Sequence, residues 1–123
     1  MSRLLAMAVP IAAGKDAEWH QFIRELKDNR LEEFQASRRK LGVRERTFYQ
    51  ETPMGGLVLV TLEGDNPEEA LRQFAQGKDA FTQWFMEKVK ATHDIDLAAI
   101  VQSPLPQMLL DSGMVEAPAA QRV

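Results

Sequence analysis

The sequence predicts an α+β protein built on an antiparallel sheet that is apolar on both faces. Two strand-like runs, Leu4 to Ile11 and Leu57 to Leu62, carry almost no polar side chain. Successive side chains of a strand point to opposite faces, so a face exposed to water normally shows a polar residue at every second position. Helices usually cover one face of such a sheet. A second copy of the same sheet is the simplest way to bury the other face, so we expect a homodimer.

The segment after the first strand is predicted to be helical. Gly14 permits a turn, and Lys15 to Lys27 has apolar residues at helical spacing. The pair Asp28-Asn29 interrupts this pattern. A second helical segment is expected from Asn29 to Leu41, with Gly42 closing it. The pattern fits either one kinked helix or two consecutive helices.

A strand pair and two further helices are predicted next. Val43 to Glu51 is rich in β-forming residues, and Leu57 to Glu63 is predicted to pair with it. The turn between them, Thr52 to Gly56, is longer than a two-residue loop, which leaves the register open. Pro67 and two following glutamates mark the start of one helix. Asp79 can cap another, ending at Thr92 or His93.

The order of these elements is that of a ferredoxin-like, split βαβ subunit. It requires a last strand, which we assign to Gln107 to Leu110, after an approach held extended by Pro104 and Pro106. We expect residues 1–113 to form one domain. Residues 114–123 show little apolar periodicity and are expected to form a loosely ordered tail.

Composition limits the classes of partner. The chain is 45% hydrophobic and 27% charged, which is typical of a soluble globular protein, and its net charge of -3 gives no electrostatic reason to expect nucleic acid. The basic residues of Arg38 to Lys40, with Arg44 and Arg46, are interpreted as solvated surface that compensates a helix dipole. No run approaches ~18 apolar residues, so no membrane span is expected. The absence of cysteine fits a cytoplasmic protein.

Several stretches carry a resemblance to a known family. They are Pro10 to Trp19 (Pro-Ile-x-x-Gly-Lys-x-x-x-Trp), Arg38 to Gly42, Gln50 to Gly55, Trp84-Phe85 and His93 to Leu97. Over roughly residues 5 to 112 the chain resembles a group of small uncharacterised bacterial proteins. That group is similar to the dimeric α+β barrel superfamily, which includes antibiotic-biosynthesis monooxygenases and haem-degrading monooxygenases.

The resemblance implies two ferredoxin-like sheets packed face to face, with a ligand between sheet and helices of each subunit. It implies a small-molecule-binding protein, and its monooxygenase members imply a cofactor-independent oxidation of a small aromatic or apolar compound. No catalytic motif of the superfamily matches this chain residue by residue, and fold alone does not carry function. The alternative is a non-catalytic dimeric module for sensing or protein interaction.

Two residues are candidates for proton transfer. His93 ends a helix beside Asp94 and Asp96, where its imidazole could be oriented and tuned; the alternative is a structural role as a cap at the helix end. Tyr49 shares a strand face with Glu51, so that its hydroxyl and the carboxylate could form a proton relay. A tyrosine that packs and keeps a hydrated hydroxyl is the structural alternative.

Five residues are candidates for ligand binding. Trp84 and Phe85 would wall the space between helices and sheet, and Trp19 lies on the inner stripe of the first helix. Arg30 falls on the same stripe if that helix is continuous, and Glu51 lies near the pocket mouth. No His or Cys spacing typical of a metal site occurs, so neither a metal nor a cofactor is expected.

Overall fold

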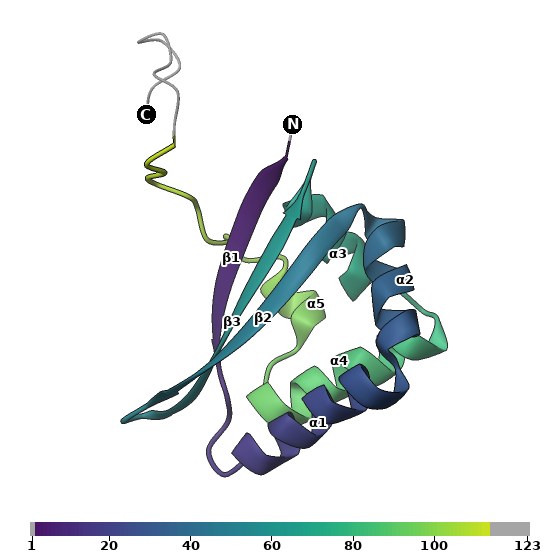
Figure 1. Ribbon diagram of the computed structural model, residues 1–123, viewed down its shortest axis with the longest axis vertical. Coiled ribbons are helices and arrows are strands. Elements are labelled where there is room, and N and C mark those ends of the chain that lie inside the picture. The colour runs from purple at the N-terminus through teal and green to yellow at the C-terminus, as the bar shows by residue number, and fades with distance from the viewer. Residues whose placement is uncertain (1, 114–123) are drawn as a thin grey trace, which may run out of the picture.

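One antiparallel sheet and five helices make up the part of the chain that the structure describes, residues 2–113 of a computed structural model (Figure 1). The strands are β1 (Arg3–Pro10), β2 (Val43–Thr52) and β3 (Gly55–Gly64). The helices are α1 (Asp16–Asn29), α2 (Leu31–Leu41), α3 (Pro67–Ala75), α4 (Ala80–His93) and α5 (Leu97–Ile100). The predicted α+β class is confirmed. The predicted tail, residues 114–123, lies outside the described residues.

The sheet has the strand order β1-β3-β2, with both pairings antiparallel. Thr52 pairs with Gly55, so only Pro53 and Met54 form the turn between β2 and β3, and the longer turn predicted from Thr52 to Gly56 is wrong. The Thr52 hydroxyl donates to the Gly55 carbonyl at 2.7 Å and accepts from the Met54 amide at 3.1 Å. Gly55 has a φ of 116°, which residues with a Cβ rarely adopt. This turn fixes the register that the sequence left open.

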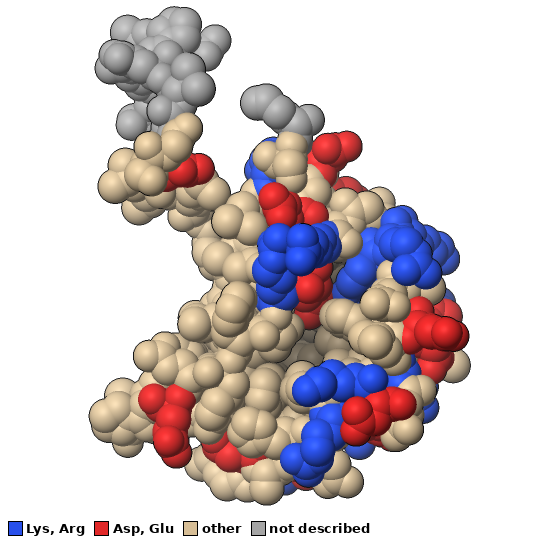
Figure 2. All heavy atoms as spheres, viewed as in Figure 1, with Lys and Arg blue, Asp and Glu red and all other residues tan. Residues whose placement is uncertain are grey.

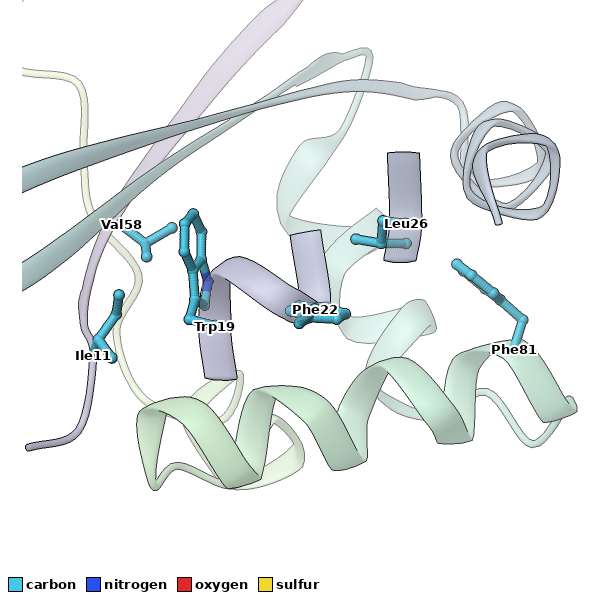
Figure 3. Close-up of a cluster of buried hydrophobic side chains, with 6 residues drawn as sticks. All are labelled: Ile11, Trp19, Phe22, Leu26, Val58 and Phe81. Atoms are coloured by element: carbon cyan, nitrogen blue, oxygen red, sulfur yellow. The ribbon is translucent and has the colours of Figure 1, made fainter. Parts of the chain in front are cut away.

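Two buried clusters hold the helices against one face of the sheet. The first joins α1, α4 and the sheet, as Figure 3 shows, and consists of Ile11, Trp19, Phe22, Leu26, Val58 and Phe81. The second lies under α3 and α5 and consists of Leu5, Leu62, Leu71, Ala75 and Val101. Full burial of one such side chain contributes about 1.5–3 kcal/mol, so these contacts set the helix layer on the sheet.

The first helical region is two helices rather than one kinked helix. Arg30 separates α1 from α2 with a φ of -132°, outside the helical range. The capping box predicted from Asn29 is wrong, because α2 begins after Arg30 without a side-chain cap. Gly42 ends α2 in the left-handed conformation, with a φ of 74°, as expected for a helix-terminating glycine. The chain then turns directly into β2.

The predicted last strand is wrong. Residues 107–110 form no strand, and Met108, Leu109 and Leu110 are 53%, 83% and 85% exposed. The half-buried Leu105 is the last side chain of this segment that packs on the core. Prolines at 104 and 106 lack the N–H groups that a ladder needs, so an apolar run beyond them does not suffice to extend the sheet. Within residues 2–113 the sheet therefore has three strands.

The face of the sheet opposite the helices is apolar at one end. Leu57 and Leu59 are half-buried on the central strand, and Phe48 beside Leu59 is 53% exposed. At the other end Arg46 Nη1 donates to Glu63 Oε1 at 3.1 Å. In the described part of the chain no helix covers this face (Figure 1).

Candidate functional site

A cavity of about 130 Å³ lies between the inner face of the sheet and the helices. Every strand and every helix contributes to its walls, which are mostly apolar and include Met7, Val9, Trp19, Phe22, Val58 and Val60. Figure 2 shows the molecule hollowed between the edge of the sheet and helices α1 and α2, with charges of both signs at the rim. The exposed Thr47 of β2 lines the cavity at this edge.

One buried ion pair interrupts the apolar wall. Arg38 Nε, from the last turn of α2, donates to Glu45 Oε1, on β2, at 2.7 Å. The two side chains are each only 8% exposed. Arg38 Nη1 also donates to the Ser37 hydroxyl at 2.9 Å, and the Thr47 hydroxyl donates to Glu45 Oε2 at 3.3 Å. The turn at Gly42 brings α2 and β2 together and so makes this pairing possible.

Aromatic rings surround the guanidinium of Arg38. Its Cζ lies 4.7 Å from the ring centroid of Phe34, 4.4 Å from that of Phe74 and 4.9 Å from that of Phe85. Each distance is short enough for a cation–π interaction. The prediction that the basic cluster is solvated surface is therefore wrong for Arg38. Its planar cation is buried because aromatic faces and a carboxylate replace water around it.

His93 lies in the cavity wall at the end of α4. Its Nδ1 donates to the Pro10 carbonyl at 2.9 Å, which fixes Nε2 as the acceptor of the neutral ring. Burial lowers the pKa of His93, and the Pro10 carbonyl opposes this shift only partly. The imidazole is therefore neutral at pH 7. Asp94, which follows it, ends the helix with a φ of 56°.

The stability of the protein is expected to fall in mild acid because of His93. An unfolded chain takes up a proton at this histidine near pH 6.5, whereas the folded chain does so only at lower pH. The contribution of neutral His93 to the free energy of unfolding is thus complete above about pH 6.5, and it is lost as the pH falls towards the lowered pKa. His93→Gln can still donate to Pro10 but cannot titrate, so its stability should depend less on pH.

Urea unfolding at about pH 7.5 and about pH 5.5 measures this dependence, one condition on each side of the ordinary histidine pKa. His20→Gln, which lies outside the cavity wall, is the matched control for loss of a histidine. An equal acid-induced loss of stability in wild-type protein and in His93→Gln would contradict the assignment.

Tyr49 does not line the cavity but faces Asp16 at the start of α1. Its hydroxyl donates to Asp16 Oδ2 at 2.7 Å, and its ring stacks on Trp19 at 5.5 Å between centroids. The hydrogen bond to Asp16 is the main reason why the pKa of Tyr49 is raised, with burial and the charges of Asp16 and Glu51 adding to it. Tyr49 is therefore a protonated donor at neutral pH.

The cavity brings together three of the seven residues proposed from the sequence: Trp19, Phe85 and His93. The other four lie outside its lining. The guanidinium of Arg30 lies over the ring of Trp84, with Cζ 4.2 Å from the ring centroid, and Arg30 Nη1 forms an ion pair with Glu33 Oε1 at 3.3 Å. Glu51 is exposed near the end of β2, opposite Gly56.

Neither Arg38 nor Glu45 was predicted to belong to the site, and Arg38 was interpreted as solvated surface. The sequence did indicate Glu45, because it lies at every-second-residue spacing from Val43 and Thr47 and so shares their face of β2. A carboxylate on the inner face of a strand requires a buried cation nearby, and Arg38 precedes it by one tight turn.

The described residues contain neither a metal-binding cluster nor a membrane-spanning helix. No group of three or more His, Asp or Glu side chains within residues 2–113 is arranged to hold a metal ion. Among the helices of the same residues, none is long and apolar enough to cross a bilayer.

Comparison with known proteins gives no match. No family model fits the sequence, and neither a curated protein nor a solved structure matches the chain. The resemblance to the dimeric α+β barrel superfamily therefore stays a prediction, and function has to be argued from the cavity.

Proposed function

We propose that the protein binds a small, largely apolar molecule with a single aromatic ring in the cavity between its sheet and its helices. The observation that carries the proposal is the cavity volume of about 130 Å³ within mostly apolar walls. An apolar cavity of about 150 Å³ holds benzene. Sites for drug-sized ligands measure roughly 300–1,000 Å³, so a haem or a polycyclic compound would not fit without movement of the helices.

The wall residues suit an aromatic guest. Trp19, Phe22 and Phe85 offer rings for edge-to-face or offset contacts, which add about 0.5–1.5 kcal/mol per pair beyond the burial of area. The wall is not wholly apolar, because Arg38 and Glu45 provide polar groups that can orient a guest. A few polar groups in an apolar pocket are typical of small-molecule sites.

Titration with toluene tests the proposal, with ligand-observed NMR and the melting temperature as readouts. Toluene at about 100 times its Kd should stabilise the fold by ~2.7 kcal/mol. Val60→Phe places a ring in the cavity and should abolish binding, whereas Leu105→Phe adds a ring outside it and should bind as the wild type does. Absence of binding to the wild type, or unchanged binding to Val60→Phe, would contradict the proposal.

Acid–base catalysis on the bound molecule is a second candidate, favoured by His93. A neutral imidazole in the wall of an apolar cavity, with Nδ1 fixed on Pro10, has Nε2 available as a base. An enzyme of this kind would fit the cofactor-independent oxidation implied by the resemblance. His93→Gln should then abolish turnover of a bound compound and leave its Kd nearly unchanged. If the protein only binds its ligand, the wild type itself will show no turnover.

We also propose that two ferredoxin-like subunits form a dimeric α+β barrel through the sheet face opposite the helices. The strand order β1-β3-β2 agrees with three of the four strands of that arrangement. Leu57, Leu59 and Phe48 give this face an apolar end that is costly to leave in water. A second copy would cover it with the same side chains.

Light scattering of the native chain tests the dimer. We expect twice the chain mass of 13.9 kDa, and a single-chain mass for Leu59→Glu, because a carboxylate cannot be buried unpaired between two sheets. Leu109→Glu changes a side chain that is 83% exposed beyond the sheet and should remain dimeric. A wild-type protein that scatters as one chain at micromolar concentration would refute the dimer and leave the binding proposal intact.

A further inference from the structure

The Arg38–Glu45 pair has hydrogen-bonding groups that its own contacts do not use, and these determine which ligand groups the cavity can bind. A guanidinium carries five N–H groups, and Arg38 uses two of them: the N–H of Nε donates to Glu45 and one N–H of Nη1 donates to Ser37. Glu45 accepts one bond from Arg38 and one from Thr47, the latter long at 3.3 Å, and a carboxylate can accept about four. The pair therefore has further donors and acceptors side by side within a mostly apolar wall.

The charges of the cavity wall cancel. Among residues 2–113, the ionisable side chains that line it are Arg38, Glu45 and His93. Arg38 and Glu45 neutralise each other at 2.7 Å, and burial lowers the pKa of His93 so that its ring is uncharged at pH 7. A charged guest would meet attraction from one member of the pair and repulsion from the other, and it would lose its hydration as well.

We infer that the cavity selects a neutral, one-ring aromatic compound whose substituent both donates and accepts hydrogen bonds, with a primary carboxamide as the best match. The inference rests on the proposed binding function and specifies its ligand class. The planar amide has an N–H to donate to Glu45 and a carbonyl to accept from Arg38. The ring occupies the apolar part of the cavity near Trp19 and Phe22.

A series of compounds with the same ring and substituents of the same size tests the inference: benzamide, benzoate, benzamidinium, acetophenone and cumene. They differ in charge and in hydrogen-bonding capacity but hardly in shape. Calorimetric titration of the native chain gives their Kd values. Benzamide should bind most tightly, by about tenfold or more over each of the others, because hydrogen bonds to charged groups contribute most when they are buried.

Each result has a defined meaning. Tighter binding of benzoate or benzamidinium than of benzamide would overturn the inference, because the cavity would then select a charged ligand. Equal Kd values for benzamide and cumene would overturn it too, while binding of cumene would leave the proposed function standing. Failure of every compound, cumene included, would overturn both. The series is measured on the unaltered chain and so does not depend on any variant folding.

A double variant identifies the groups responsible. Arg38→Met combined with Glu45→Leu removes both charges and keeps the wall apolar, a type of replacement that folds normally in known cases. The preference for benzamide over cumene should disappear in this variant. Glu69→Gln with Arg72→Gln removes an exposed ion pair on α3, at 3.6 Å, and should keep the preference. A preference for benzamide that persists in the first variant would contradict the role of the pair.

Discussion

Arg38→Met alone is expected to lower the free energy of unfolding by about 3–5 kcal/mol, the usual cost of removing one partner of a buried ion pair. Methionine fills much of the volume of arginine, so packing against Phe34, Phe74 and Phe85 is largely kept. The loss comes from Glu45, whose side chain is 8% exposed and would be left buried without the cation that compensates it. Urea denaturation at neutral pH measures the change.

Two comparisons separate charge from packing in this result. Arg38→Met combined with Glu45→Leu should recover most of the lost stability, because no buried charge remains. Arg72→Met removes the cation of an ion pair whose side chains are about half exposed, and should cost no more than about 1 kcal/mol. Equal losses for Arg38→Met and Arg72→Met would mean that the buried pair does not stabilise the fold in the way described.

The same pair links the fold to the site. It joins the end of α2 to β2 at the edge where the cavity meets solvent. The two residues are seven positions apart, and the left-handed Gly42 between them reverses the chain within that distance. A local feature of the sequence, a glycine that ends a helix directly before a strand, thus places a buried ion pair in a mostly apolar cavity wall.

Most of the secondary structure could be predicted because it depends on local patterns. Helical spacing predicted α1 and α4, and Pro67 with the two following glutamates predicted the start of α3, where the Asn66 side chain accepts from the Glu69 amide at 3.2 Å. The predicted strand at residues 107–110 failed because strand formation depends on a partner edge. An apolar run shows only that a segment could be buried, and Met108 to Leu110 are exposed.

The site could be predicted where the position of a residue on a helix face, or at a helix end as for His93, determined it. Trp19 and Phe85 lie on apolar stripes that had to face the sheet, and both reach the cavity. The partner of Tyr49 could not be predicted, because Asp16 is 33 positions away and the pair meets only after β2 and α1 have packed. Arg38 was misjudged because a run of basic residues is typical of a solvated helix end, and the inward-facing Glu45 was overlooked.

Trp19→Ala is expected to cost about 3–5 kcal/mol of stability and to widen the cavity enough for a larger guest. Trp19 is 4% exposed, and its ring both lines the cavity and stacks on Tyr49 at 5.5 Å. The surrounding wall can collapse only in part, so most of the ring's volume should be left as empty space. A domain of ordinary stability, about 5–15 kcal/mol, remains folded for the measurement.

Two ligands and one control variant make this expectation testable. Naphthalene should bind to Trp19→Ala and not to the wild type, and it should raise the melting temperature of that variant alone. Trp84→Ala removes a half-buried ring that lies under Arg30 outside the cavity lining, so it should cost less stability and leave naphthalene unbound. Naphthalene binding to the wild type as tightly as toluene would mean that the cavity is larger in solution than one ring requires. The size limit on the ligand, which follows from the closeness of Trp19 to Phe22 and Val58 in the same cluster, would then have to be abandoned.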